Sequence, residues 1–414
     1  MFENKQEQAK AILVAADIGE YDIERSLDEL EELTKTAQAE VIARVTQKRA
    51  AYETGTCIGE GKLKEVAEMC EKLEPDLIIF DHELTATQVR NIEEVSKIRT
   101  IDRTTLILDI FAQRAISAEG KLQVELAQQR YRLPRLAGMG VALSRLGGGI
   151  GTRGPGETKL ETDKRHIRRR ITALEEELAE ITKRREFNRS RRKKDNVIVV
   201  AIVGYTNVGK STLLNTLTNA GVLAENKLFA TLDITARALE LPDGRNVLLI
   251  DTVGLIRRLP HHLVEAFKST LEEAANADLI MNIIDVSAED AYEQAEVTRN
   301  LLTELGCDGI PQINILNKID LIDFAEIPED DTTVKISAKT GYGLDKLLYC
   351  IAKNLPQTSY RMNLLIPYGK EGLINKIRVD GKVFSEEYTE NGTKVDALVD
   401  VKLYSQAEEF KINN

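Results

Sequence analysis

Residues 204–211 read Gly204-Tyr205-Thr206-Asn207-Val208-Gly209-Lys210-Ser211 and carry the spacing G-x-x-x-x-G-K-S of a phosphate-binding loop. Residues 197–203, immediately before this loop, are an almost unbroken run of valine and isoleucine, which is typical of a buried parallel strand. A helix is expected to begin near Lys210, so that its positive end and the main-chain N–H groups of the loop face phosphate oxygens. The order strand, glycine loop, helix therefore predicts an α/β domain of the P-loop class.

Further residues complete a site for a metal-bound triphosphate. Lys210 should reach the β- and γ-phosphates, and the Ser211 hydroxyl should ligate Mg²⁺. Asp251 begins the sequence Asp-Thr-Val-Gly after an apolar run, where its carboxylate can hold Mg²⁺ through water, and Gly254 leaves room for its N–H to meet the γ-phosphate. Thr231 lies between these motifs, where a switch threonine completes the metal shell; the alternative is an ordinary loop threonine. The predicted Mg²⁺ ligands are therefore Ser211, Thr231 and Asp251.

A third motif indicates which base is bound. Residues 317–320 read Asn-Lys-Ile-Asp and follow a predicted strand at 312–316. The Asp320 carboxylate can accept hydrogen bonds from both N1–H and the 2-amino group of guanine, whereas adenine would leave it unpaired at a cost of about 1–3 kcal/mol or more. Residues 337–339, Ser-Ala-Lys, follow another short strand and should add main-chain and stacking contacts to the same base. The sequence thus predicts GTP as the substrate of a hydrolase.

The residues expected to contact the nucleotide share a place in one of these motifs. They are Gly204, Tyr205, Thr206, Asn207, Val208, Gly209, Lys210, Ser211, Thr212, Phe229, Ala230, Thr231, Leu232, Asp233, Asp251, Thr252, Val253, Gly254, Asn317, Lys318, Asp320, Ser337, Ala338 and Lys339. Four of them are the candidates for catalysis: Lys210, Thr231, Gly254 and Asn207.

Two positions bear on the rate of hydrolysis. In Ras-type small GTPases a glutamine directly after the Asp-x-x-Gly motif orients the attacking water, and here Leu255, which makes no side-chain hydrogen bond, stands there. We expect slow hydrolysis by the isolated protein, with a partner or another residue completing the site. Asn207 resembles the loop asparagine of potassium-activated GTPases, in which a K⁺ ion supplies positive charge to the transition state. The alternative, that Asn207 only shapes the loop, is equally open.

The chain divides by pattern into four parts, one of which is the nucleotide domain. Residues 1–116 alternate short apolar runs with amphipathic stretches, which predicts a mainly parallel sheet covered by helices. The predicted strands are 11–16, 41–45 and 77–81, and the predicted helices are 23–33, 62–73 and 87–97. Residues 196–357 form the nucleotide domain. Residues 358–414 contain two extended runs separated by a turn signal at 390–392, which predicts a small α+β domain.

Residues 117–195 have a different sequence pattern. The positions of Ile167, Ile171, Leu174, Leu178 and Ile181 follow the 4-3-4-3 spacing of a short heptad seam on a highly charged helix. An earlier stretch, 122–133, is also helical in pattern, and between the two lies a glycine-rich segment, 147–156, which favours neither helix nor strand. We expect a hairpin of two packed helices joined by a flexible loop that carries Arg153. The basic run 189–194 is interpreted as a solvated linker.

Composition limits the class of protein. The 414 residues carry 56 basic and 67 acidic side chains, a formal charge of −11, which argues against a surface that coats nucleic acid throughout. Residues 121–195, in contrast, have an excess of roughly ten basic residues. The four cysteines have no metal-ligand spacing and are expected to be reduced thiols, and no apolar run approaches the roughly 20 residues of a membrane span. The chain is expected to be cytoplasmic and monomeric.

The sequence resembles the HflX family of translational GTPases over nearly its whole length. The resemblance rests on the nucleotide motifs and on residues 102–112, 123–128, 133–136, 143–145, 147–161, 228–233 and 259–261; the run 147–158 is highly specific to the family. Two departures are visible: Val208 stands where the family usually has alanine, and Leu255 where it usually has phenylalanine. Members have been reported to bind ATP through the amino-terminal region, but no recognised ATP motif is present here.

The resemblance implies a GTPase that binds the large ribosomal subunit and splits stalled or idle ribosomes, with hydrolysis stimulated by the ribosome. It also implies a helical hairpin whose glycine-rich loop approaches the peptidyl-transferase region. A basic hairpin on an acidic chain suits local docking into rRNA, with affinity that falls steeply with salt. Two other readings remain open: a GTPase of large-subunit assembly, and a nucleotide-regulated RNA-binding adaptor.

Overall fold

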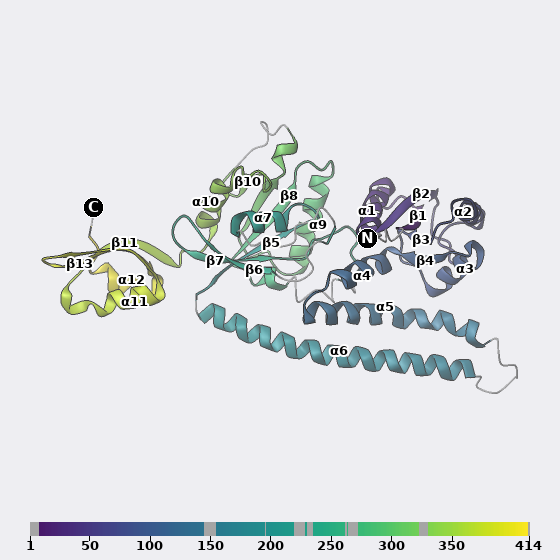
Figure 1. Cartoon of the computed structure of the whole chain (residues 1–414), viewed down its shortest axis with the longest axis horizontal. Coiled ribbons are helices and arrows are strands. Elements are labelled where there is room, and N and C mark those ends of the chain that lie inside the picture. The colour runs from purple at the N-terminus through teal and green to yellow at the C-terminus, as the bar shows by residue number, and fades with distance from the viewer. Residues whose placement is uncertain are drawn as a thin grey trace, which may run out of the picture. The chain divides into compact units, whose positions relative to one another are not determined.

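The computed structural model describes residues 8–144, 155–194, 196–218, 228–229, 235–260, 263, 272–322 and 330–412 (Figure 1). Contacts divide the chain into two compact units, each made of several segments. Unit 1 contains Met1–Arg185, Glu225–Asp233 and Arg258–Ser269; unit 2 contains Glu186–Ala224, Ile234–Arg257 and Thr270–Asn414. Two short segments from the middle of the chain therefore belong to the amino-terminal unit.

Unit 1 is built around the predicted parallel sheet. Its strands are β1 (Ala9–Asp17), β2 (Ala39–Lys48), β3 (Leu77–Phe80) and β4 (Arg99–Asp102), in the order β2-β1-β3-β4. All three pairings are parallel. The apolar run in β1 is at most 1% exposed, as expected for a strand covered on both faces. The three predicted strands are thus confirmed, and β4 is an addition, because its four residues include no apolar run.

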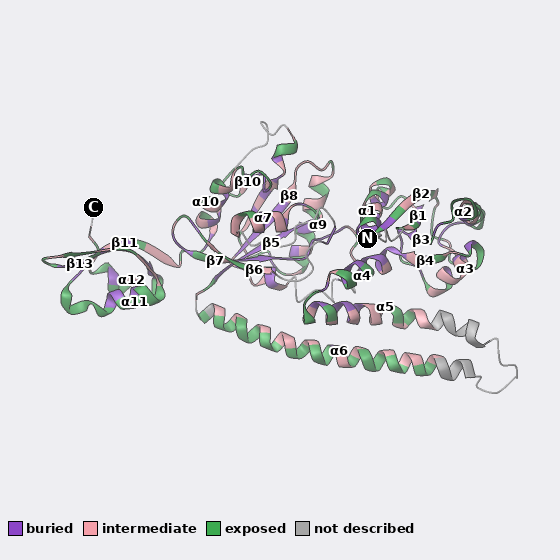
Figure 2. Cartoon of the chain, viewed as in Figure 1, coloured by how far each residue is buried: buried purple, intermediate pink, exposed green. Residues whose placement is uncertain are grey.

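Four helices cover this sheet, and three of them begin at a side-chain cap. They are α1 (Ile23–Thr36), α2 (Glu60–Leu73), α3 (Ala86–Ser96) and α4 (Arg103–Arg114). Asp22 accepts hydrogen bonds from the first turn of α1, Thr85 and Gln88 form a capping box on α3, and Asp102 caps α4. Figure 2 shows the result: the inner strands β1 and β3 are largely buried, and the helices expose their outer faces. The three predicted helices are confirmed with longer bounds.

The predicted helical hairpin is present in unit 1. Helix α5 (Ala118–Ser144) and helix α6 (Pro155–Lys194) run antiparallel, with Leu174 of the predicted seam fully buried (Figure 1). Ion pairs link the helices, among them Arg130–Glu175 at 2.8 Å and Arg185–Glu119 at 2.5 Å. Residues 145–154 of the glycine-rich segment lie outside the described residues. The expectation that residues 155–156 belong to the loop is wrong, because Pro155 begins α6, a position that suits its fixed φ.

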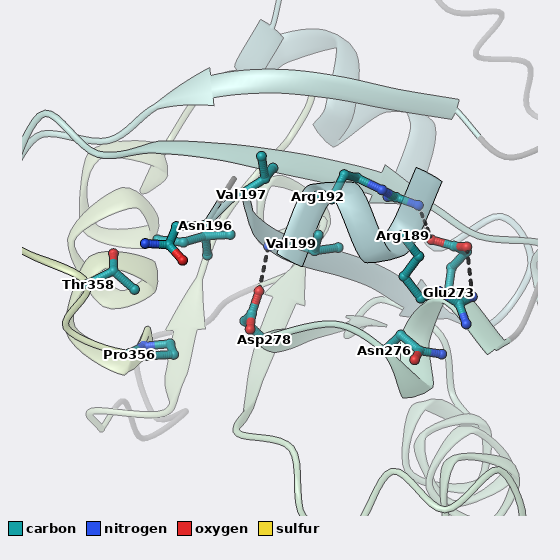
Figure 3. Close-up of a pocket in the computed structure, with 11 residues that line it drawn as sticks. Arg189, Arg192, Asn196, Val197, Val199, Glu273, Asn276, Asp278, Pro356 and Thr358 are labelled. Carbon is teal, nitrogen blue, oxygen red and sulfur yellow. Dashed lines mark hydrogen bonds and ion pairs between the residues drawn. The ribbon is translucent and has the colours of Figure 1, made fainter. Parts of the chain in front are cut away.

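The interpretation of residues 189–194 as a solvated linker is also wrong. Helix α6 continues to Lys194, since arginine and lysine are good helix formers. Arg189 and Arg192 donate to the Glu273 carboxylate over 3.1 and 3.5 Å, and Glu273 is only 4% exposed (Figure 3). A buried carboxylate requires compensating charge, so these two arginines hold the end of α6 against unit 2 residues.

Unit 2 contains a six-stranded sheet in the order β10-β9-β8-β5-β7-β6. Its strands are β5 (Ile198–Gly204), β6 (Thr235–Glu240), β7 (Asn246–Asp251), β8 (Leu279–Asp285), β9 (Gln312–Asn317) and β10 (Thr333–Lys335). The pairings are parallel except for β6 with β7. The same region contains helices α7 (Lys210–Thr218), α9 (Ala291–Glu304) and α10 (Leu344–Asn354) and the short helix η1 (Ile319–Leu321). The central strand β5 is buried along its whole length, as the valine run predicted.

The carboxyl-terminal part of unit 2 is a small α+β fold. Strands β11 (Ser359–Ile366), β12 (Lys382–Thr389) and β13 (Gly392–Asp400) pair antiparallel in the order β11-β13-β12. Helices α11 (Gly372–Asp380) and α12 (Val401–Glu408) pack on the sheet, with the short helix η2 (Tyr368–Lys370) before them. The predicted turn joins β12 to β13. Among the described residues, no helix has both the length and the apolar character needed to cross a membrane.

Candidate nucleotide-binding site

The phosphate loop connects β5 to α7 as predicted, and its glycines are required by packing. Gly204 has φ +150°, and a Cβ there would lie 2.5 Å from the Ile283 carbonyl oxygen. Gly209 has φ +99°, and a Cβ there would collide with the Asn317 side chain. Asn207 adopts a left-handed φ of 60°, which asparagine tolerates better than most residues. The loop is therefore wound with its main chain close to its neighbours.

Lys210 is held across this loop. Its ammonium group donates to the main-chain oxygens of Gly204 at 3.0 Å and Tyr205 at 2.6 Å. Burial lowers the pKa of Lys210 to about 8, and the nearby Asp251 carboxylate opposes the shift. A buried ammonium whose charged form is disfavoured gains most from an anion. The position of Lys210 thus fits contact with phosphate.

The predicted metal ligands Ser211 and Asp251 lie side by side. The Ser211 hydroxyl donates to Asp251 Oδ2 over 2.9 Å, and Asp251 is fully buried at the end of β7. The next residue, Thr252, is fixed by a hydrogen bond from its hydroxyl to the Ile202 carbonyl oxygen at 2.8 Å. A hydroxyl and a carboxylate oxygen are the ligand types that Mg²⁺ prefers, so this pair fits the ion.

Gly254 also lies against the phosphate loop. A Cβ at Gly254 would stand 2.7 Å from Thr206 Cγ2 and 3.1 Å from Lys210 Nζ, so only glycine fits here. The neighbouring Val253 and Leu255 are buried. The structure therefore brings the Asp-Thr-Val-Gly segment and the lysine of the loop together, although 44 positions separate Lys210 from Gly254 in the sequence.

The segment predicted to supply the switch threonine is largely outside the described residues. This holds for Ala230, Thr231, Leu232 and Asp233. Phe229, which was also predicted to contact nucleotide, is a buried residue of unit 1. Its ring packs edge-on against Phe111 with 4.6 Å between ring centroids. For Phe229 the structure thus shows a packing role in the amino-terminal unit.

Asn317 connects the base-reading residues to the phosphate loop. Its Nδ2 donates to the Val208 carbonyl oxygen at 2.7 Å, and its Oδ1 accepts from the Ala338 N–H at 2.9 Å. Asp320 lies in η1 and is exposed, while Ser337, the first residue of the Ser-Ala-Lys motif, is buried. Asn317 thereby joins three predicted motifs, so its side chain positions the loops in addition to any contact with the base.

Several other predicted residues have clear positions. Thr212 lies in the first turn of α7, and its carbonyl oxygen accepts from Thr216. Lys339 is exposed. Lys318 has a left-handed φ of 65° and forms an ion pair with Asp285 at 2.6 Å. Motif spacing does not identify Asp285; the available signal in the sequence is an acid at the end of the largely apolar run 279–284.

Comparison with known proteins supports the same reading. Three family descriptions match consecutive parts of the chain: GTP-binding GTPase N-terminal at residues 24–112, GTP-binding GTPase Middle Region at 114–192, and 50S ribosome-binding GTPase at 199–318. GTPase HflX of Caldanaerobacter subterraneus subsp. tengcongensis is 51% identical over 414 residues, which are 100% of this chain and 96% of the relative. The chain belongs to the HflX family of GTPases.

Other HflX proteins give the same result. GTPase HflX of Escherichia coli (strain K12) is 40% identical over 405 residues, covering 96% of this chain and 95% of the relative. Among solved structures, the complex of SsGBP with GDP is similar with a TM-score of 0.48 and 27% identity, covering 83% of this chain and 98% of that one. The two HflX relatives confirm the resemblance inferred from the residues over nearly the whole chain.

Proposed function

We propose that this HflX GTPase binds Mg²⁺ and GTP at the loop of residues 204–211, docks on the large ribosomal subunit and splits stalled or idle ribosomes into subunits. The observation that carries the nucleotide part is the geometry around the loop: Asn317 and the segment that contains Asp251 and Gly254 both contact the loop, which itself carries Lys210. These four residues all belong to unit 2.

Each group at the site has a defined task in this proposal. Lys210 places positive charge on the β- and γ-phosphates, and the Gly254 N–H meets the γ-phosphate. Ser211 and Asp251 would hold Mg²⁺, which supplies charge neutralisation to the phosphate oxygens when bound. Asp320 selects guanine. Leu255 is buried and apolar, so its side chain cannot orient water, and hydrolysis is expected to be slow until the ribosome completes the site.

The ribosome part of the proposal is supported by the family description 50S ribosome-binding GTPase and by the charge on α6. Arg165, Arg168 and Arg169 are all exposed on this helix. Exposed arginines on a long helix suit contact with rRNA phosphates. We further propose that the protein acts as a cytoplasmic monomer, which sedimentation at the mass of a single chain would support.

The predicted parts of the chain then divide the work. Residues 196–357 bind nucleotide, and the hairpin of residues 117–195 binds rRNA through its loop at 147–154. The amino-terminal part, 1–116, and the carboxyl-terminal part, 358–414, support these two. Deleting residues 147–154 should therefore abolish ribosome splitting while GTP binding persists, and unchanged splitting would contradict this division.

A potassium ion at Asn207 is part of the proposal. Asn207 is exposed at the turn of the loop, where its amide oxygen is available to a monovalent cation. A cation there would supply charge to the transition state. Turnover in K⁺ should exceed turnover in Na⁺ at matched ionic strength; equal rates would leave Asn207 with the role of shaping the loop.

Sucrose-gradient centrifugation tests the main proposal. Intact ribosomes are incubated with the protein and a non-hydrolysable GTP analogue, and release of free subunits is expected. A variant with Arg168→Glu and Arg169→Glu should bind nucleotide normally but lose ribosome association, because repulsion from phosphate replaces attraction. Binding only to precursor particles would indicate an assembly GTPase. Lack of any ribosome association by the unmodified protein would indicate a nucleotide-regulated adaptor.

A further inference from the structure

Tyr205, the second residue of the phosphate loop, makes hydrogen bonds through both its main chain and its side chain. It is only 5% exposed. Its main-chain oxygen accepts from the Lys210 ammonium group at 2.6 Å. Its ring hydroxyl accepts from the main-chain N–H of Arg257 at 2.6 Å. One residue therefore contacts both the lysine of the loop and the segment that follows Gly254.

Two main-chain hydrogen bonds run beside the tyrosine contact. The Leu255 N–H donates to the Gly204 oxygen at 3.2 Å, and the Thr206 N–H donates to the Leu255 oxygen at 2.8 Å. They form a parallel bridge between Tyr205 and Leu255, which resumes the pairing of β5 with β7 beyond the end of β7. Gly254 lies directly before this bridge, next to Lys210. Its main chain is thus fixed relative to the loop.

Arg257, at the end of this segment, is held through both its main chain and its side chain. Its guanidinium group forms ion pairs with Asp290 at 2.5 Å and Glu293 at 2.8 Å, near the start of α9. The side chain of Arg257 is therefore held by α9, while its N–H is held by Tyr205. Replacing Tyr205 by phenylalanine would remove the hydroxyl contact and leave the ion pairs and the main-chain bonds in place.

We propose that the Tyr205 hydroxyl is a positioning group for GTP hydrolysis, which holds residues 254–257 so that the Gly254 N–H meets the γ-phosphate at a fixed place. The inference rests on the proposed role of Gly254 in contacting the γ-phosphate. Hydrogen-bond donors accelerate a reaction most when they are held in advance where charge develops. Because the side chain of Leu255 cannot make a hydrogen bond to orient the attacking water, the reaction depends more on the position of this segment's main chain. The hydroxyl should therefore affect the hydrolysis of bound GTP and not the binding of GDP, since GDP has no γ-phosphate for Gly254 to contact.

Comparison of Tyr205→Phe with Tyr349→Phe tests the proposal. Tyr349 lies in α10 and is 66% exposed, so its variant controls for the loss of a tyrosine hydroxyl in the same domain. The Tyr205 variant should bind GDP as tightly as the unmodified protein, and its single-turnover hydrolysis rate should fall roughly three- to tenfold, the effect of losing one neutral hydrogen bond. The control variant should change neither quantity. An unchanged hydrolysis rate, or a loss of GDP affinity that matches the loss of rate, would overturn the proposal.

Amide hydrogen exchange at Arg257 in the unmodified protein gives a second test that requires no substitution. Exchange should be slow with GDP and slower still with a non-hydrolysable GTP analogue, because both ends of the segment are then held. Fast exchange in the GTP-analogue complex would overturn the proposal even if the phenylalanine variant did not fold. Failure of the unmodified protein to bind GTP at all would instead count against the proposed function, so the two failures are distinguishable.

Discussion

The parallel sheet of unit 1 and the mainly parallel six-stranded sheet of unit 2 each have a buried aspartate at the carboxyl end of an interior strand: Asp81 follows β3, and Asp251 ends β7. Both are at most 1% exposed. Asp81 accepts from the Ser26 hydroxyl at 2.8 Å, Arg103 at 3.1 Å and Arg258 at 2.6 Å. Asp251 accepts from the Ser211 hydroxyl, at the edge of a loop whose main chain is wound for phosphate. Similar positions in similar sheets therefore have different surroundings.

These surroundings decide what each acid does. Burial acts to raise the pKa of Asp81, but Arg103, Arg258 and the Ser26 hydroxyl together lower it below its usual value. Its carboxylate is thus saturated by side chains of its own unit. Ligands of α/β sheets bind at the carboxyl ends of strands, and Asp81 shows that this position can also be filled from within. The comparison assigns structural work to Asp81 and leaves metal binding as the proposed role of Asp251.

Asp81→Ala should have the largest effect on stability. Removing one member of a buried charge cluster leaves Arg103 and Arg258 uncompensated, so the free energy of unfolding should fall by about 3–5 kcal/mol. Chemical denaturation followed by circular dichroism measures the loss. The control is Asp28→Ala: Asp28 pairs with Arg44 but its side chain is 65% exposed, so its variant should lose at most about 1 kcal/mol. Equal losses in the two variants would remove the distinction drawn for Asp81.

The fold could be predicted wherever the pattern was local. The apolar runs of β1 and β3 and the glycine loop after β5 identify themselves within a few residues. Strand β4 was missed because Arg99 and Asp102 bound a segment too short to show alternation. The end of α6 was misread because a run of arginines looks solvated in isolation. Only the fold shows that Glu273, about 80 positions later, is buried beside them.

The candidate site was predictable to the same extent. Motif spacing placed Lys210, Ser211 and Asp251 in one site, because each motif is recognised from residue types at fixed spacing in the sequence. The connections between motifs were not predictable, because they join residues far apart in the sequence. Asn317 contacts Val208 across 109 positions, and Tyr205 contacts Arg257 across 52. Nothing in either residue's neighbours in the sequence indicates its partner.

Lys210→Ala should have the next largest effect, and Lys62→Ala sharpens the comparison of the two sheets. Lys62 follows Gly59 and Gly61 near the start of α2, a superficial echo of a phosphate loop, but it pairs with Glu65 on the surface. Loss of Lys210 removes charge-assisted contacts to phosphate, so affinity for GTP should fall roughly a hundredfold. The Lys62 variant should bind GTP normally. Calorimetric titration of GTP into both variants measures the two affinities. Weakened GTP binding by the Lys62 variant would indicate that nucleotide binds at the sheet of unit 1 instead.

The smallest expected effect is a proton taken up when GTP binds at alkaline pH. The pKa of Lys210 is lowered to about 8, below its usual 10.5. Unfolding would restore the usual value, so between these two limits the unfolded chain binds more protons, and this group's contribution to stability rises with pH. Phosphate favours the charged lysine and reverses that preference, so GTP binding should weaken as pH rises above about 8. More protons should therefore enter with each nucleotide at pH 8.5 than at pH 7. Titrations in two buffers of different ionisation enthalpy measure this uptake, and equal binding heats in both at pH 8.5 would show that Lys210 is already charged in the free loop.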